Sequence, residues 1–335
     1  RNRGGELLVT VSLSVPATAS NLGGGFDCVG AAVELRLWLT AQLPPAGDAL
    51  TLVRTGTLAV LDAPAADDLI VAGFRAACAR ANRPLPARVA FTASSDIPVA
   101  RGLGSSAAAI VAGAAAANAL LGLGLTDDAL IALGAELEGH PDNVAPAVLG
   151  GTVLAVSDAA GALVIAPLRV HPGLRFVFAV PDFTIDTPRA RAALPRELPH
   201  IDARRAAAAS AALVAGLERG DAALLAVGLD GPLHVPYRRA LVKGYDQVTR
   251  AARAAGALGA TLSGSGSSIV AVAGAEQAPE VAAAMSVAWT AMGVTTYTIV
   301  SSPGGGGLQI EPPAMDASRN NSAQVGRSST VEIES

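Results

Sequence analysis

The sequence predicts an α+β protein built from two domains. Its 335 residues are enough for two domains of ordinary size, and 51% of them are hydrophobic, which is enough for a sizeable core. Strand-like and helix-like segments are mixed along the chain without the regular alternation of a doubly wound fold. In the second half, strands and helices combine in a way that is typical of α+β domains with an antiparallel sheet.

The first domain is expected to cover residues 1–165. Short runs rich in β-branched and aromatic residues, such as 88–92, are typical of strands, whereas longer runs with helical spacing indicate helices. Strands are predicted at 7–13, 33–41, 50–53, 88–92, 151–156 and 163–166, and helices at 67–82, 105–122, 126–138 and 142–149.

The second domain is expected to cover residues 166–302. Its predicted strands are 175–180, 259–263, 268–273 and 295–300, and its predicted helices are 203–219, 221–228, 245–255 and 277–291. From Pro303 onward the chain is rich in Gly, Ser, Asn and Gln and poor in large apolar residues. We therefore expect residues 303–335 to form a mobile tail outside both domains.

Composition excludes several classes of function. The net charge is −4 and only 3% of residues are aromatic, so nucleic-acid binding is not expected. The most apolar run, 107–125, is mostly alanine and glycine and predicts a buried helix rather than a membrane span. Two cysteines and four histidines cannot make a standard zinc site, and no secretion signal opens the chain. These features favour a cytoplasmic protein in which Cys28 and Cys78 are buried thiols.

The segment 98–108 predicts an anion-binding loop. It reads P-V-A-R-G-L-G-S-S-A-A and lies between a predicted strand and a predicted helix. Gly102 and Gly104 allow a tight turn and a close approach to a ligand, and Ser105 or Ser106 could cap the helix. Backbone N–H groups at a helix start suit phosphate. The simpler alternative is an ordinary glycine-rich turn with a serine cap.

The common phosphate loops do not fit this segment. A Walker A loop needs a lysine after its last glycine, and the only lysine of the chain is Lys243. A dinucleotide fingerprint needs a third glycine, where this sequence continues Ser-Ser-Ala.

Two further loops accompany the first. Residues 16–27 (P-A-T-A-S-N-L-G-G-G-F-D) and 259–268 (G-A-T-L-S-G-S-G-S-S) are also rich in Gly and Ser, and each lies beside a predicted strand. In this order, the three segments resemble the signature motifs of the small-molecule kinases that act on galactose, homoserine, mevalonate and phosphomevalonate. The resemblance covers residues 9–300. It implies a ribosomal S5-like N-terminal domain, a ferredoxin-like C-terminal domain, and a site between them that uses ATP and Mg²⁺.

Four shorter matches narrow the resemblance to the homoserine kinase branch. They are E-G-H-P-D-N-V-A-P at 138–146 followed by Gly150 and Gly151, N-L-G-G-G-F-D at 21–27, T-P-R-A-R-A-A-L-P at 187–195, and H-V-P-Y-R at 234–238. The resemblance implies transfer of the ATP γ-phosphate to L-homoserine in threonine biosynthesis, by a homodimer. The alternatives are a sister kinase for another alcohol, such as mevalonate, and a non-catalytic sensor that binds ATP or substrate.

The family pattern assigns the nucleotide and the metal to the second and third motifs. Ser106 and Glu138 are expected to hold Mg²⁺, a hard cation that prefers oxygen ligands. Ser106 could instead cap its helix, and Glu138 could be a solvated acid, with Glu136 an equal choice on spacing alone. The expected ATP-binding residues are Pro98, Val99, Ala100, Arg101, Gly102, Leu103, Gly104, Ser105, Ser106, Ala107, Ala108, Ser263, Gly264, Ser265 and Gly266.

Homoserine carries a carboxylate, an ammonium and a hydroxyl, and each needs its own partner. Planar guanidinium groups bind carboxylates in a bidentate manner, which favours Arg191 and Arg238, although surface positions are the alternative for both. Asp27 suits the ammonium. Asn21 and Asn143 suit the hydroxyl or polar backbone, while Asn21 and Asp27 could also be turn formers. Thr187 is added to this substrate set from its motif.

The roles of two further residues stay open. Asp142 stands where sister kinases place a general base, but a hydroxyl attacking phosphate can also lose its proton late, to the phosphate itself. Asp142 is therefore either a base or a substrate ligand. His140 is a ligand, a supporting group or a packed ring. Asp68 replaces an asparagine that the family usually places near the adenine, which puts that contact in doubt.

Overall fold

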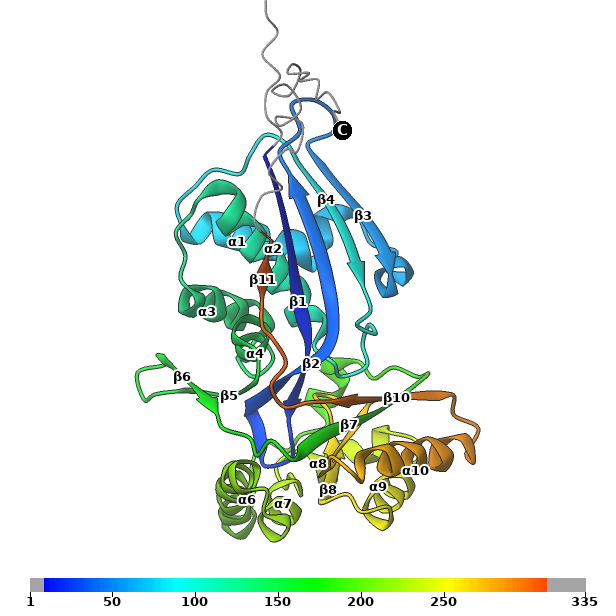
Figure 1. Ribbon diagram of the computed structural model, residues 1–335. Helices are drawn as coiled ribbons and strands as arrows, with labels where there is room; N and C mark the ends of the chain where they lie inside the picture. The colour runs from blue at the N-terminus through cyan, green and yellow to red at the C-terminus, as the bar shows by residue number, and fades with distance from the viewer. Residues whose placement is uncertain (1–8, 312–335) are drawn as a thin grey trace, which may run out of the picture.

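The computed structural model describes residues 9–311, which form two β-sheets joined by one hydrophobic core (Figure 1). The larger sheet has the order β11-β1-β2-β4-β3, and β5 and β6 extend from β2. Its neighbours are antiparallel except β3 and β4, which are parallel and are connected through helix α1. The strands are β1 (Thr10–Asn21), β2 (Gly25–Gln42), β3 (Leu50–Gly56), β4 (Val89–Ser95), β5 (Thr152–Ser157), β6 (Leu163–Leu168) and β11 (Gln309–Ile310).

Four helices pack on one side of this sheet (Figure 1). Their packing is close because the facing residues are small: a Cβ on Gly113 of α2 would lie 1.8 Å from the carbonyl oxygen of Ile70 in α1. The alanine-rich α2 is thus a core helix, as its sequence predicts. The helices are α1 (Leu69–Arg80), α2 (Ser105–Leu121), α3 (Asp127–Glu138) and α4 (Val144–Leu149), with 3₁₀ turns at Thr57–Val60 and Ala65–Asp67.

The smaller sheet has four antiparallel strands in the order β10-β7-β9-β8. Counted along the chain, that order is fourth, first, third, second, which is the expected ferredoxin-like arrangement. The strands are β7 (Leu174–Pro181), β8 (Gly259–Leu262), β9 (Ile269–Gly274) and β10 (Thr296–Ser301). The helices are α5 (Thr187–Ala192), α6 (His200–Arg219), α7 (Ala222–Gly228), α8 (Val235–Arg238), α9 (Tyr245–Ala254) and α10 (Ala278–Thr290), and a 3₁₀ turn spans Arg239–Leu241.

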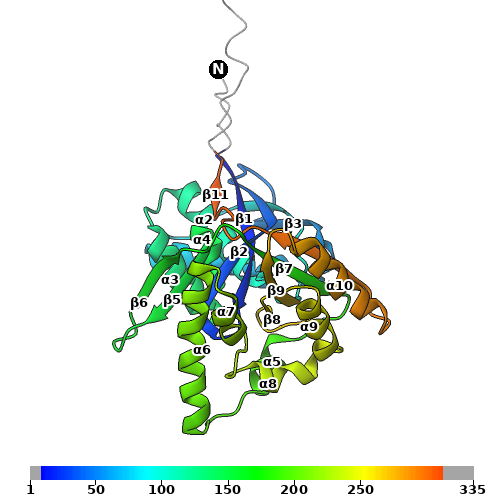
Figure 2. The same cartoon turned by 60° about the horizontal axis from the view of Figure 1, so that its bottom comes forward.

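Both faces of the smaller sheet are buried. Along β7, Phe176 and Phe178 belong to the core shared with the larger sheet, whereas Val177 and Ala179 belong to a second core under α9 and α10. This alternation follows from the period of two in a strand. The sheet therefore joins the two halves of the molecule, which Figure 2 shows from below.

The α+β fold class is confirmed, and the predicted strands and helices form with shifted ends. The first motif differs from expectation: residues 16–21 lie within β1 and residues 25–27 within β2, so the loop is only the turn at 22–24. The short helices α5 and α8 were not predicted, because each spans six residues or fewer and carries no helical period.

The predicted tail is wrong for residues 303–311. There β11 pairs with β1, Gly306 bridges to Gly150, and the Arg36 guanidinium donates to the Gly307 carbonyl at 2.7 Å. The rest of the predicted tail, 312–335, lies outside the described residues. Within 9–311, no helix combines the length and apolar character needed to cross a bilayer.

Candidate active site

The three glycine-rich motifs meet at one polar pocket between the two sheets. The amide of Gly264 donates to the Ser20 carbonyl at 3.0 Å, and the Ser263 hydroxyl donates to the Gly102 carbonyl at 2.7 Å, which ties the third motif to the other two. The pocket is lined by Ser20, Asn21, Asp27, Ala100, Gly102, Gly104, Ser105, Ser106, Glu138, His140, Asn143, Thr187, Arg191, Arg238, Gly264 and Ser265.

Helix α2 begins at this pocket without a serine cap. Its N-cap is Gly104, in the left-handed conformation at φ 65°, and no side chain of the described chain caps the helix. The expected cap by Ser105 or Ser106 is therefore wrong. A Cβ on Gly104 would lie 2.0 Å from Thr18 Oγ1, so the position also requires glycine for space. The first N–H groups of a 17-residue helix thus face the pocket, an arrangement suited to an anion.

Ser106 and Glu138 form a pair of oxygen donors at the edge of that helix start. The Ser106 hydroxyl donates to Glu138 Oε1 at 2.6 Å, across the beginning of α2 and the end of α3. The alternative acid, Glu136, instead pairs with Arg80 at 2.6 Å on an exposed surface. Oxygen donors at this spacing fit a Mg²⁺ ion, which keeps its remaining positions for phosphate and water.

Some of the residues that were predicted to bind the nucleotide do not line the pocket. The Arg101 guanidinium donates to the carbonyls of Pro181 and Asp182 at 2.9 and 2.8 Å, and so ties the second motif to the end of β7. The predicted residues that do not line the polar pocket or its apolar neighbour are Pro98, Arg101, Leu103, Ala107, Ala108, Ser263 and Gly266.

An apolar pocket adjoins the polar one and shares Ala100, Ser105, Ser106 and Thr187 with it. Asp68 lies on its wall, but its carboxylate accepts from the Ile70 amide at 2.8 Å and pairs with Arg54 at 2.7 Å. Asp68 thus caps α1. The apolar lining includes Leu58, Leu61, Ile70, Val99, Ala109 and Ile185. Of these, only Val99 was predicted, since single apolar residues contributed by separate segments carry no signal of a shared pocket.

The opposite end of the polar pocket is charged. Asp27 and Arg191 form a bidentate contact, with Oδ1 to Nη2 at 3.1 Å and Oδ2 to Nη1 at 3.3 Å. Arg238 is 2% exposed, and its Nε donates to the Ala190 carbonyl at 3.1 Å. Burial, together with the charge of Arg191, lowers the pKa of Arg238 to about 10. Arg238 is therefore not a surface arginine.

Both pocket asparagines hold neighbouring chain segments. Asn21 donates to the Gly264 carbonyl at 2.8 Å and accepts from the Asp27 amide at 3.0 Å, which supports Asp27 in a left-handed conformation at φ 55°. Asn143 accepts from Thr18 Oγ1 at 2.9 Å and donates to Ser20 Oγ at 3.1 Å. Thr18 and Ser20 are supporting residues that the sequence analysis missed.

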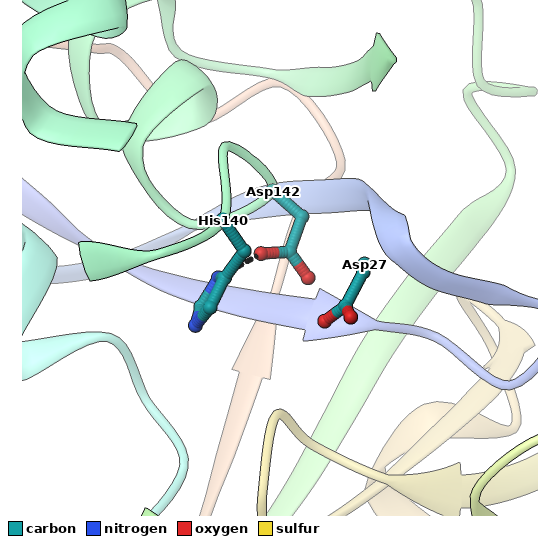
Figure 3. Close-up of side chains that lie close together, drawn as sticks. All are labelled: Asp27, His140 and Asp142. Atoms are coloured by element: carbon teal, nitrogen blue, oxygen red, sulfur yellow. Dashed lines mark hydrogen bonds and ion pairs between the residues drawn. The ribbon is translucent and has the colours of Figure 1, made fainter. Parts of the chain in front are cut away.

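His140 and Asp142 form a hydrogen-bonded pair beside Asp27 (Figure 3). His140 Nδ1 lies 2.5 Å from Asp142 Oδ1, and Asp142 is 1% exposed. Burial alone lowers the pKa of His140, but the hydrogen bond and charge of Asp142 outweigh it and raise the pKa above its usual value. Asp142 Oδ2 has no hydrogen-bond partner among residues 9–311, and Asp27, His140 and Asp142 present ligand atoms within 4.8 Å of one another. The group thus offers carboxylate oxygens to a small cation.

Phe26 and His234 are two further residues that the sequence analysis did not assign to the site. Their rings stack with centroids 5.0 Å apart, and the Arg238 guanidinium carbon lies 5.1 Å from the centre of the Phe26 ring. Both residues lie within the motifs quoted above: Phe26 directly precedes Asp27, and His234 lies four positions before Arg238.

Comparison with known proteins places this geometry in a family. Residues 68–151 match the GHMP kinases N terminal domain, and residues 213–290 match the GHMP kinases C terminal domain. A mevalonate kinase from L. major, solved in complex with R-mevalonate, has a TM-score of 0.62 at 18% identity over 88% of this chain and 96% of its own, a likeness of fold alone.

Other relatives are much more similar in sequence. Homoserine kinases of Picosynechococcus sp. and Nostoc sp. are 40% and 41% identical, over 86% and 87% of this chain and 94% and 95% of theirs. The crystal structure of homoserine kinase from Cytophaga hutchinsonii has a TM-score of 0.82 at 28% identity, over 93% of this chain and 100% of that one. The chain therefore belongs to the GHMP kinase family, among its homoserine kinases.

Proposed function

We propose that this protein transfers the γ-phosphoryl group of ATP to the hydroxyl of L-homoserine and releases ADP and O-phospho-L-homoserine. The hydroxyl oxygen bonds to the γ-phosphorus, the bond from that phosphorus to its bridging oxygen breaks, and the hydroxyl proton leaves. The observation that carries the proposal is one pocket in which an uncapped helix start lies beside the buried Arg238 and the carboxylate of Asp27. These groups complement a triphosphate and a zwitterion.

ATP is expected to lie across the two adjoining pockets. The apolar one suits the flat, weakly polar adenine, and the shared residues Ser105 and Ser106 lead from it to the start of α2. There the backbone of residues 102–106 would hold the phosphates in place of a lysine. Positioning of this kind supplies most of what phosphoryl transfer requires of a protein.

Ser106 and Glu138 would hold Mg²⁺, which when bound neutralises charge on the phosphate oxygens. Glu138→Gln is expected to raise the Mg²⁺ concentration for half-maximal activity by about tenfold or more, because one anionic ligand is lost. Glu136→Gln is the matched control, since Glu136 lies two positions earlier on the same helix and pairs with Arg80 instead. An unchanged Mg²⁺ requirement in the Glu138 variant would contradict the assignment.

Homoserine is expected to lie at the charged end. Arg238, which has no carboxylate partner within the described chain, would bind the substrate carboxylate, together with Arg191. Asp27 and the unpartnered Oδ2 of Asp142 would accept hydrogen bonds from the ammonium. Thr187 contacts Ser265 Oγ at 3.2 Å, at the junction of the two substrates' expected positions.

The hydroxyl proton is expected to leave late, to the transferring phosphoryl group. Asp142 is a poor candidate for a general base because its Oδ1 already accepts a hydrogen bond from His140 Nδ1, at 2.5 Å. Its side chain is also grouped with that of Asp27, an arrangement that suits an ammonium group. We therefore assign Asp142 to substrate binding.

A coupled assay of ADP release tests the function directly. L-homoserine is expected to support turnover, whereas mevalonate, which lacks an ammonium group for Asp27 and Asp142, is not. Turnover with mevalonate alone would indicate the sister-kinase alternative. Binding of both ligands without ADP release would indicate a sensor.

The proposal also includes the pathway of the product, the cellular compartment and the oligomeric state. O-phospho-L-homoserine is the phosphorylated intermediate of threonine biosynthesis, and we expect the protein to act in the cytoplasm. A homodimer remains a prediction from the family, and light scattering at assay concentrations measures it.

A further inference from the structure

Arg238 is a buried cation that the protein leaves without an acidic partner in the described part of the chain. Its guanidinium has five N–H donors, and only Nε is bonded, to the carbonyl of Ala190. Arg238 is one of the residues that line the polar pocket. Asp27, an acid in the pocket wall, is already paired with Arg191. The positive charge of Arg238 is therefore available to a ligand.

An aromatic ring takes the place of that missing acid. The guanidinium carbon lies 5.1 Å from the centre of the half-buried Phe26 ring, within the range of a cation–π contact. A ring face attracts the cation without neutralising it. A carboxylate at the same place would attract it more strongly, but it would compete with the carboxylate of a substrate for the same N–H groups.

His234, which is fully buried, stacks on the Phe26 ring. The two rings are stacked at an interplanar angle of 19°, and His234 is 0% exposed. Its Nε2 lies 3.1 Å from the Gly23 carbonyl, which accepts the ring N–H, and Gly23 lies in the turn just before Phe26. Burial and the charge of Arg238 lower the pKa of His234 to about 3, so the imidazole is neutral and adds no second charge beside Arg238.

We propose that Phe26 and His234 are positioning residues that keep the Arg238 guanidinium free and turned towards the substrate carboxylate. They thereby set the preference of the enzyme for an amino acid over the corresponding amino alcohol. This inference rests on the proposed function and deepens it.

The test compares L-homoserine with 3-amino-1-propanol, which has the same hydroxyl and ammonium but no carboxylate. The ratio of the two kcat/KM values reports the carboxylate contact alone. Phe26→Leu is expected to lower this ratio by about tenfold, or about 1.4 kcal/mol, which lies between an exposed and a fully desolvated cation–π contact. Phe26→Tyr keeps the ring face, and its ratio of kcat/KM values is expected to stay close to that of the wild type. His234→Gln keeps a donor for the Gly23 carbonyl but removes the stacked ring, and it is expected to lower the ratio as well.

Two controls separate positioning from general damage. Phe91→Leu removes a ring from another buried aromatic pair, Phe74 with Phe91, and is expected to lower Tm without changing the ratio. In an Arg238→Met background, Phe26→Leu is expected to leave the ratio unchanged, because both residues act on one contact.

The outcomes are distinct. A ratio that stays at the wild-type value in both Phe26→Leu and His234→Gln would overturn the inference, as would an equal fall in the Arg238→Met background. If Phe26→Leu fails to fold, His234→Gln against Phe26→Tyr decides. Failure of the wild type to release ADP with L-homoserine would instead reject the proposed function. Titration with L-homoserine and a non-hydrolysable ATP analogue would then measure the same carboxylate preference as binding.

Discussion

At the scale of single residues, the contact between His140 and Asp142 makes stability depend on pH. The net effect of Asp142 is to raise the pKa of His140 above its ordinary value of 6.5. A pKa that is higher in the folded state means that folding binds the proton more tightly. The contact therefore stabilises the fold fully below the unfolded value, and this contribution is lost as pH rises through the folded value.

His140→Gln tests this dependence. The difference in Tm between wild type and variant is expected to be largest near about pH 5–6 and to shrink as the pH rises above the folded pKa. His200→Gln is the control, because His200 is exposed at the start of α6. A difference in Tm that is constant over this range would show that the imidazole contributes only packing.

Asp142 gives a second prediction at this scale. Asp142→Asn keeps the shape of the side chain but removes its charge. If Asp142 binds the ammonium, KM for homoserine is expected to rise by about tenfold or more, while kcat changes by only a few-fold. The pKa of His140, followed by NMR, is expected to fall because its stabilising anion is gone. A fall in kcat of about 10²–10⁴ with KM unchanged would instead identify a general base.

At the scale of elements, two glycines at opposite ends of α2 separate conformation from function. Gly104 caps the start at φ 65°, and Gly122 caps the end at φ 60°. A Cβ on Gly122 meets no described atom within 4 Å, whereas one on Gly104 would meet Thr18 Oγ1 at 2.0 Å. The two sites share the cost of a left-handed residue and differ only in what surrounds them.

Alanine at each position measures that difference. Gly122→Ala is expected to lower stability by about 1–2 kcal/mol, from conformation alone, and to leave kinetics unchanged. Gly104→Ala adds a clash at the pocket and is expected to lower kcat/KM for ATP as well, by about tenfold or more, through displacement of the helix start. Equal effects of both variants on ATP kinetics would argue against an anion site at that helix start.

The sequence predicted a helix or strand well where composition and hydrophobic period within that segment were sufficient. The strand at β4 and the helix α2 follow from composition and period. The predicted serine cap of α2 was wrong. A Cβ at residue 104 would clash with Thr18 Oγ1, so glycine is required at the N-cap, and the spacing of residues within the loop cannot indicate that contact. The first motif formed strand rather than loop, because Ala-Thr-Ala-Ser pairs with β2, although Thr18 is the one typical strand residue among these four.

The site was predictable in its residue types but not in its contacts. The motifs predicted Asp27, Arg191 and Arg238 as substrate ligands, and the structure brings all three to one pocket. They could not indicate that Asn21 would bond to Gly264, 243 positions away, or that Arg238 would lie over the Phe26 ring. Such contacts depend on how the two sheets meet, which is a property of the whole fold.

At the scale of the whole molecule, the two halves are tied together around the pocket. The turn between β1 and β2 reaches the second half, where the Gly24 amide donates to Gly228 at 2.7 Å and the Gly24 carbonyl accepts from Ser210 at 2.6 Å. Arg101 makes a second link, to the end of β7. The pocket lies between these links, so its geometry depends on both halves being folded.

The chain end adds a third link, far from the pocket. After β10, residues 303–311 return to the larger sheet: the Gly151 amide donates to Gly305 at 2.7 Å, the Leu308 amide to Val148 at 3.0 Å, and the Glu311 amide to Ser12 at 2.9 Å. The polar pocket contains no residue of this segment. The segment is therefore expected to contribute to stability and not to catalysis.

Two shortened chains test that expectation, one ending at residue 302 and one ending at residue 311. Each lost backbone hydrogen bond weakens the fold by about 0.5–1.5 kcal/mol, but ordering each residue costs about 1–2 kcal/mol, so the net contribution is small. The chain ending at 302 is expected to have a Tm about 2–6 °C below that of the longer one, at about 2 °C for each kcal/mol. Its kcat and KM, measured well below Tm, are expected to match those of the longer chain. A kinetic change without a change in Tm would mean that the returning segment acts on the pocket, through the strand β1, which pairs with β11 and ends at Asn21.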